Sequence, residues 1–194
     1  MRSSSGYTLL EVLFVSGVVS VLGSIAVPQA LTTLDDVRAA GAARYIAGRL
    51  QRTRMEAVMR SADVAIRFTQ EAAGYAYAMY VDGNRNGVRS ADIAKGVDRE
   101  LMPVERLGDH FPGVTFGTLA NLPAVDSGGT APGTDPIRLG SSNMASFSGN
   151  GTSSTGTLYI RGRGTSQYAV RVFGETGKTR ILKFEARTRK WTPL

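Results

Sequence analysis

A long apolar stretch near the start of the chain limits what the protein can fold into more than any other feature. The 21 residues from Tyr7 to Val27 carry a single charge, that of Glu11. As an α-helix they would extend about 31 Å, at roughly 1.5 Å per residue, which matches the thickness of the hydrocarbon core of a bilayer. The stretch therefore predicts a membrane-spanning helix, and the position of Glu11 inside it needs an explanation.

Two interpretations of this stretch leave the carboxylate unexplained. A secretory signal peptide would combine the basic Arg2, the apolar run and a small-residue cleavage site at residues 24–26. A plain membrane anchor would account for the length of the run. In either case Glu11 is an acid inside an apolar span, which costs about 3 kcal/mol at the centre of a membrane.

A third interpretation gives Glu11 a partner. If the chain is cut after Gly6, the α-amino group of Tyr7 becomes the new terminus and is mostly protonated at neutral pH. A neighbouring helix that is shifted along its axis would bring its own terminal ammonium to this Glu11. At about 4 Å and an effective dielectric constant near 20, the contact is worth roughly 4 kcal/mol before desolvation. Glu11 would then set the register between stacked subunits.

The segment Gly6-Tyr7-Thr8-Leu9-Leu10-Glu11, followed by an apolar helix with Pro28, resembles the class III signal of type IV pilins and type II secretion pseudopilins. In that family a prepilin peptidase cuts after the glycine and methylates the new terminal residue, which is usually Phe and is Tyr7 here. Subunits then pass from the inner membrane, through an assembly platform, into a helical filament. The resemblance implies a cleavage site at Gly6 and Tyr7, N-methylation of Tyr7, and assembly roles for Glu11 and Pro28.

The helical pattern continues beyond Pro28 to about residue 60. Apolar side chains recur there at steps of three and four, from Leu31 to Val58. Pro28 should kink the helix because it removes a backbone hydrogen bond. Five arginines are expected on the intervening surface: Arg38, Arg44, Arg49, Arg52 and Arg60. The pattern predicts one long helix, its first half in lipid or a filament core and its second half on a sheet.

After about residue 62 the apolar period becomes two, which predicts β-strands. The segments "ADVAIRFTQ" and "GYAYAMYVD" should pair through a turn at residues 71–74. Further strands are predicted at "GVTFG", "PIRL", "MASFS", "GTLYIRG", "QYAVRVF", "TRILKFE" and "RKWTP". With helix first and strands after, we expect an α+β fold in which a long N-terminal helix packs on antiparallel sheets, as in type IV pilins. The expected divisions are a leader (1–6), a transmembrane assembly segment (7–34) and a periplasmic globular domain (35–194).

The C-terminal segment "GTLYIRGRGTSQYAVRVFGETGKTRILKFEARTRKW" resembles the sheet of H-type (GspH) minor pseudopilins and of FimT-type minor pilins. In those proteins an alternating strand is followed by a turn and a Gly-Arg-x-Arg element. Here the element is Gly177-Lys178-Thr179-Arg180, so a lysine replaces the first arginine. The resemblance does not cover residues 121–156, which are rich in Gly, Ser, Thr and Pro and predict surface loops around two short strands.

The basic residues of this segment allow two interpretations. Residues 161–190 carry nine cations and two acids, and the chain as a whole has a formal charge of +7. FimT-type proteins bind DNA in natural transformation, and Trp191 offers a ring on which a base could stack. The resemblance therefore implies candidate DNA contacts at Lys178, Arg180, Lys183, Arg187 and Arg189. The alternative is a plain hairpin turn at Gly177, flanked by basic side chains that keep a strand edge soluble.

The loop Asp82-Gly83-Asn84-Arg85-Asn86-Gly87 matches the first half of a calcium-binding loop, with candidate ligands Asp82, Asn84 and Asn86. The second half does not match, because the twelfth position is Ile93 and not a carboxylate. A hairpin loop built from turn-forming residues is the alternative interpretation.

No enzymatic motif is evident. His110 is the only histidine, no nucleotide-binding motif occurs, and the absence of cysteine excludes disulfides and thiolate metal sites. We therefore expect a non-enzyme without cofactors: a minor pseudopilin of a type II secretion pseudopilus or, alternatively, a FimT-type minor pilin that binds DNA. The expected location is the bacterial inner membrane, in a single pass with a periplasmic C-terminal domain. The expected partners are the lipid bilayer, prepilin peptidase, the assembly platform, other pilins or pseudopilins, and secreted cargo or DNA.

Overall fold

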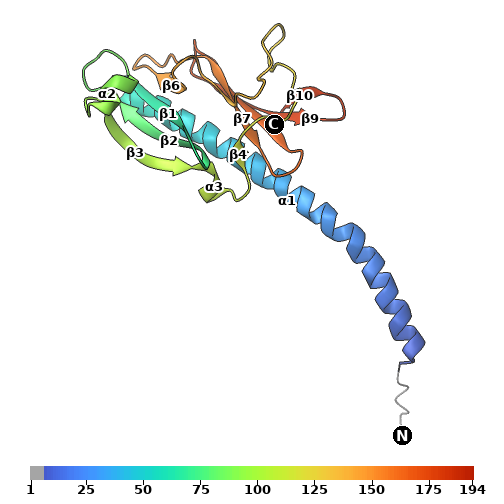
Figure 1. Ribbon diagram of the computed structural model, residues 1–194. Helices are drawn as coiled ribbons and strands as arrows, with labels where there is room; N and C mark the ends of the chain where they lie inside the picture. Colours follow the sequence, from blue (N-terminus) through green and yellow to red (C-terminus); the bar gives the residue numbers. More distant parts are fainter. Residues whose placement is uncertain (1–6) are drawn as a thin grey trace.

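The N-terminal helix organises the whole molecule. In the computed structural model, which describes residues 7–194, α1 runs without a break from Leu9 to Arg60 over 52 residues. Its first half projects away from the rest of the chain and curves, whereas its second half lies among the β-strands (Figure 1). The helix ends at Ser61, whose φ of 49° is in the left-handed region. Pro28 lies inside the helix and does not end it.

The second half of α1 is built for close packing. Its buried residues are mainly alanines, with Ile46 and Leu50 as the bulky members. Small side chains let a helix approach a sheet closely, so one helix can contact strands of two sheets at once. The buried residues of α1 are Ala39, Ala40, Ala42, Ala43, Ile46, Ala47, Leu50, Thr53 and Ala57.

Two antiparallel sheets follow the helix in the sequence. The first has the strand order β3-β2-β1-β6. Its strands are β1 (Val64–Glu71), β2 (Gly74–Val81), β3 (Arg99–Arg106) and β6 (Met144–Phe147). In the hairpin of β1 and β2, Glu71 lies opposite Gly74, which is the predicted turn. Two short helices flank β3: α2 (Ser90–Ala94) and α3 (Leu107–His110).

The second sheet has the strand order β10-β9-β8-β7-β4, and β5 pairs separately with β7. Its strands are β4 (Thr115–Phe116), β5 (Ile137–Arg138), β7 (Gly156–Arg161), β8 (Gln167–Val172), β9 (Thr179–Glu185) and β10 (Lys190–Pro193). One edge strand of each sheet contains a proline, Pro103 in β3 and Pro193 in β10. Because proline cannot donate a ladder hydrogen bond, both edges resist pairing with another chain's strand.

The main core fills the space between α1 and the inner faces of both sheets. Phe68, Tyr77 and Phe116 pack there edge to face or tilted, with ring centroids 5.4–6.1 Å apart. A smaller core lies on the outer face of the second sheet, where Tyr159 and Leu182 are buried. Trp191 packs into this smaller core and donates its indole N–H to the Pro123 carbonyl, at 3.0 Å. The ring of Trp191 therefore has a structural role, and its stacking against a base stays a prediction.

The α+β prediction is confirmed, with the long helix and every predicted strand in place. Three elements were missed: β3, α2 and α3. β3 reads "RELMPVER", which begins and ends with charges and contains Pro103. As an edge strand it is largely exposed, so it has little of the apolar alternation from which strands are predicted.

Candidate functional site

The head of α1 holds the residues on which the assembly prediction depends. Thr8 caps the helix: its hydroxyl oxygen accepts a hydrogen bond from the Glu11 amide, at 3.2 Å. The Thr8 amide and hydroxyl in turn donate to Glu11 Oε2, at 3.0 and 3.1 Å. This reciprocal arrangement is a capping box, which the spacing Thr8-x-x-Glu11 could have revealed in the sequence. Gly6, the predicted cleavage position, lies outside the described residues, and Tyr7 is exposed.

The capping box uses only half of the Glu11 carboxylate. Both hydrogen bonds from Thr8 reach Oε2, and no residue in the range 7–194 donates to Oε1. A carboxylate oxygen has two lone pairs, so an ammonium from a neighbouring chain could reach Glu11 without breaking the cap. The geometry is thus compatible with both a helix-capping and an intersubunit role for Glu11.

The projecting half of α1 is apolar on all sides. None of the residues from Leu9 to Leu34 is buried, and the most apolar window of α1 has a mean hydropathy of 2.2. The hydroxyls of Ser16 and Ser20 donate to backbone carbonyls four residues earlier. These internal bonds reduce the penalty of placing a hydroxyl in lipid. The helix is therefore long and apolar enough to cross a bilayer, and its exposed side chains suit lipid or other apolar helices.

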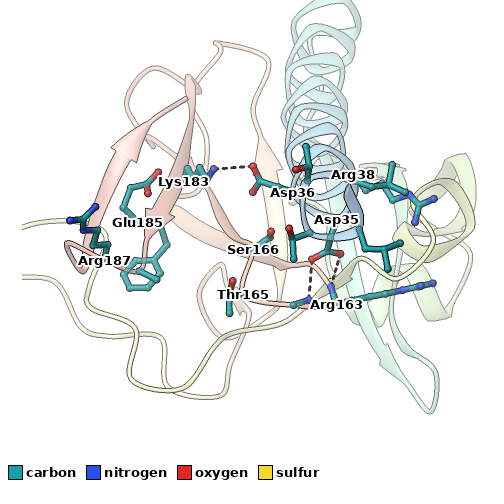
Figure 2. Close-up of a pocket in the computed structure, with 16 residues that line it drawn as sticks. Asp35, Asp36, Arg38, Arg163, Thr165, Ser166, Lys183, Glu185 and Arg187 are labelled. Atoms are coloured by element: carbon teal, nitrogen blue, oxygen red, sulfur yellow. Dashed lines mark hydrogen bonds and ion pairs between the residues drawn. The ribbon is translucent and has the colours of Figure 1, made fainter. Parts of the chain in front are cut away.

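Two adjacent carboxylates attach α1 to the globular domain at the point where the helix leaves it (Figure 2). Asp35 accepts hydrogen bonds from the backbone amides of Arg163 and Gly164, at 2.9 and 3.0 Å. Asp36 accepts from the Tyr168 hydroxyl and from Lys183 Nζ, both at 2.9 Å. Burial alone would raise the pKa of Asp36, but the hydrogen bonds from Lys183 and Tyr168 lower it overall.

A second polar cluster fixes α1 to β3. Glu105 accepts hydrogen bonds from Arg49 Nη2 at 2.7 Å, from the Tyr45 hydroxyl at 2.8 Å and from the Tyr77 hydroxyl at 3.3 Å. The side chains of Arg49 and Glu105 are each 19% exposed. We expected Arg49 on the solvent surface, and this was wrong, because its partner comes from a strand that the sequence pattern did not reveal. His110 lies at the rim of the cluster, 3.5 Å from Glu105.

The five predicted DNA contacts do not form a single patch. Alternate residues of β9 point to opposite faces of the sheet, so Lys183 faces α1 and pairs with Asp36, whereas Arg180 is exposed on the outer face. Lys178 lies in the turn before β9, and Arg187 and Arg189 lie in the turn after it. Arg189 donates to the Asn121 carbonyl at 2.8 Å. The period of two in β9 was sufficient to predict this separation.

The turn before β9 matches the hairpin interpretation. Gly177 has a φ of +61°, and a Cβ built there would lie 2.8 Å from both the Arg54 Cδ and the Gly151 carbonyl oxygen. The Gly177 carbonyl also accepts a hydrogen bond from Gln51 of α1, at 3.2 Å. Glycine is therefore required at this position by backbone conformation and by close approach to the helix.

The loop at Asp82 uses its acidic groups internally. The Asp82 carboxylate accepts from the amides of Asn84, Arg85 and Gly87, at 2.7–2.9 Å. The side-chain amide of Asn86 donates to Asp92, at 3.0 Å. No cluster of acidic or histidine residues suited to a metal occurs in the part of the chain that the structure describes. This geometry favours the hairpin-loop interpretation, and calcium binding by Asp82, Asn84 and Asn86 stays a prediction.

Comparison with known proteins places these features in a family. The family model for type II transport protein GspH matches residues 42–176, well over half of the chain. Pilin-like protein PilA1 of Thermus thermophilus is 40% identical over 81 residues, which are 42% of this chain and 50% of that protein. The chain thus aligns with about half the length of this curated relative, and no solved structure matches.

The match to the family model begins inside the buried half of α1 and ends in the turn before β9. It therefore includes the first sheet and the central strands of the second, which are the parts that enclose the helix. With a pilin-like relative and a long apolar helix packed on antiparallel sheets, the chain belongs to the GspH family of type II transport proteins.

Proposed function

We propose that this protein is a minor pseudopilin of a type II secretion pseudopilus, made as an inner-membrane precursor and processed by prepilin peptidase between Gly6 and Tyr7. The proposal treats the chain as a structural subunit and not as an enzyme. Its C-terminal domain faces the periplasm, and its partners are other pseudopilins, the assembly platform and secreted cargo. Membership of the GspH family supports the subunit role.

The observation that carries the proposal is the division of α1 into two halves with different surroundings. From Leu9 to Leu34 its apolar side chains are exposed, and from Ala39 onward one face is buried in the domain. A monomer in water gains nothing from exposing a mostly apolar helical segment of 26 residues, so the first half requires lipid or other helices around it. The proposed boundary between the assembly segment (7–34) and the globular domain (35–194) coincides with the first anchoring carboxylates.

The maturation step has a direct test. Gly6→Ala should block processing, seen as an unshifted band beside the processed wild-type protein in cells that contain the peptidase. N-terminal sequencing of the mature protein should begin at Tyr7, with or without a methyl group. A start at residue 27, after the small residues that a signal peptidase would recognise, would refute the proposal.

The assembly role of Glu11 needs a control that separates pairing from helix capping. Glu11→Ala should leave membrane insertion intact but abolish incorporation into filaments, because the acid that receives the neighbour's terminal ammonium is lost. Thr8→Ala removes the cap but keeps the carboxylate, so this variant should still assemble. If both variants fail equally, capping of the helix is the reason and the register argument is wrong.

DNA binding is the second candidate function, and it rests on two exposed cations. The side chains of Lys178 and Arg180 form no ion pair or hydrogen bond within residues 7–194. If the protein acts in transformation, DNA retention should fall steeply with salt and be lost in Lys178→Ala with Arg180→Ala. Lys95→Ala with Arg99→Ala, which removes two exposed cations near the first sheet, is the matched control. Absence of retention at low salt would leave only the secretion role.

A further inference from the structure

A cluster of exposed apolar side chains lies at the end of α1 that is farthest from the N-terminus. From residue 35 onward, the structure describes seven exposed large apolar side chains: Val37, Met55, Val58, Met59, Val104, Phe173 and Leu194. Met55, Val58 and Met59 occur within about one helical turn, and with Arg54 they line a groove of about 250 Å³. We call these three apolar residues the distal patch. Met55 and Met59 are 62% and 68% exposed.

The face of α1 that carries the distal patch also carries unpaired cations. Five residues of this face follow one another at steps of three or four, the spacing of neighbours along one side of a helix: Arg44, Gly48, Arg52, Met55 and Met59. Arg44 and Arg52 are exposed and form no ion pair or hydrogen bond within residues 7–194. A Cβ at Gly48 would meet nothing within 4 Å, so another backbone can approach this face closely.

The position of the distal patch excludes lipid as its cover if α1 spans the membrane. The end of α1 lies at the opposite end of the molecule from the projecting half (Figure 1). If Val27 ends the apolar span, Met55 lies about 42 Å farther along the helix, at roughly 1.5 Å per residue. The polar layer on each side of a bilayer is about 5–8 Å thick. An inserted helix therefore holds the patch well outside the membrane, where only a protein surface can cover it.

A second copy of this chain fits the distal patch poorly. A symmetric pair of helices would bring Arg44 and Arg52 of one chain close to the same arginines of the other, and like charges across an interface oppose association. Glu56, the acid beside the patch, already pairs with Arg60 at 3.0 Å. The formal charge of +7 on each chain adds to the repulsion. This face of α1 is therefore suited to a partner that supplies carboxylates.

We propose that the distal patch docks a different protein subunit through an apolar helix face flanked by carboxylates. Apolar side chains of the partner cover Met55, Val58 and Met59, and its carboxylates pair with Arg44 and Arg52. The flexible side chains of methionine adapt to the shape of such a partner. This inference rests on the proposed function, because insertion of α1 in the membrane is what excludes lipid. Subunits of the proposed filament leave the membrane one after another, so the partner is a subunit that left earlier.

The experiment uses the full chain in its native cells, with a photoreactive benzophenone amino acid in place of Met55. Adducts formed by light are isolated, and mass spectrometry identifies the attached peptide. The adduct should lie in another protein, in an apolar segment with Asp or Glu three or four positions away. Val104, 53% exposed on β3, is the control position and should not give this adduct.

Two matched variants test the role of charge. Arg44→Gln with Arg52→Gln should lower the yield of the Met55 adduct at least about fivefold, which is roughly the effect of losing one strong exposed ion pair. Lys95→Gln with Arg99→Gln removes the same charge at exposed positions near the first sheet, and this variant should keep the yield. Glutamine is a good helix former, and resistance to limited proteolysis checks that both variants are folded.

Several results would overturn the inference. These are an adduct with phospholipid, with a second copy of this chain or with a segment that has no carboxylate, and also the absence of any adduct at Met55. Equal yields in the two double variants would overturn it as well, because the arginines beside the patch would then have no specific role.

Failure of the proposed function gives a different result in the same cells. Cleavage before Tyr7 and retention of the chain in the membrane fraction are measured alongside the adducts. A chain that is neither processed nor inserted refutes the proposed function. A chain that is processed and inserted but forms no adduct with an acidic segment refutes only the docking surface.

Discussion

Glu105 is the residue whose removal should most weaken the attachment of α1 to the first sheet. Its carboxylate accepts hydrogen bonds from Arg49, Tyr45 and Tyr77, and Tyr77 is only 1% exposed. In Glu105→Ala the Tyr77 hydroxyl stays buried without its acceptor, which costs about 1–3 kcal/mol. The largely buried Arg49 also loses its ion pair with Glu105. A hydrogen bond to a charged group contributes about 1.5 kcal/mol to stability, and this loss is added to the first. The expected loss is therefore about 2.5–4.5 kcal/mol.

The neighbouring residue of β3 supplies the control. Arg106 pairs with Glu71 at 2.6 Å, a shorter contact than that of Arg49 with Glu105, but the two side chains are 48% and 34% exposed. Exposed ion pairs contribute roughly 0–1 kcal/mol, so Glu71→Ala should have little effect. The comparison tests whether burial, and not the distance between the charges, determines the contribution of an ion pair.

Thermal unfolding of a soluble fragment starting at Gln29 measures both effects. For a domain of this size each 1 kcal/mol shifts the Tm by about 2–4 °C, so Glu105→Ala should lower the Tm by about 5–18 °C and Glu71→Ala by less than about 4 °C. Equal shifts in the two variants would refute the reasoning from burial. A normal Tm for Glu105→Ala would show that water or a rearranged side chain replaces the carboxylate.

Two further predictions concern packing and pH. Gly41→Val should destabilise the fragment by about 1–3 kcal/mol, because a Cβ there would already lie 3.1 Å from the Phe111 ring. Gly48→Ala should stabilise the fragment by about 0.5–1 kcal/mol, because the space around its Cβ is open. Urea titrations of the two variants test this contrast. Burial opposes ionisation of Asp36 and Glu105, but their hydrogen-bonding partners outweigh it and lower the pKa values in the folded state from 3.8 and 4.5. Their stabilising contribution is therefore complete above these values and is lost as the pH falls through the lower folded-state pKa values. The Tm of the wild-type fragment should fall on acidification below about pH 4.5 more steeply than that of Glu105→Ala, and parallel curves would contradict this assignment.

Local patterns were sufficient for most of the elements. The apolar run from Tyr7, the helical period beyond it and the switch to a period of two after residue 62 each depend on neighbouring residues, so they can be recognised without the fold. The capping box of Thr8 and Glu11 could also be predicted from local spacing, although the Glu11 carboxylate was first interpreted only as a partner for another chain. The sequence pattern did not predict β3, because an exposed edge strand that contains Pro103 has no regular apolar face.

The sequence by itself determined a long apolar helix with an acid near its head, a mixed domain rich in antiparallel strands, and an excess of positive charge toward the C-terminus. Only the tertiary structure decided which charges meet. Asp36 and Lys183 are 147 residues apart and Arg49 and Glu105 are 56 apart, and no pattern within a short window relates such residues. The tertiary structure also decided which basic residues are free. Lys183 pairs with Asp36 of α1, whereas Arg180 is exposed on the opposite face of the sheet. Contacts between distant segments depend on how the sheets enclose the helix. This is the physical reason why the sequence alone could not predict these pairings.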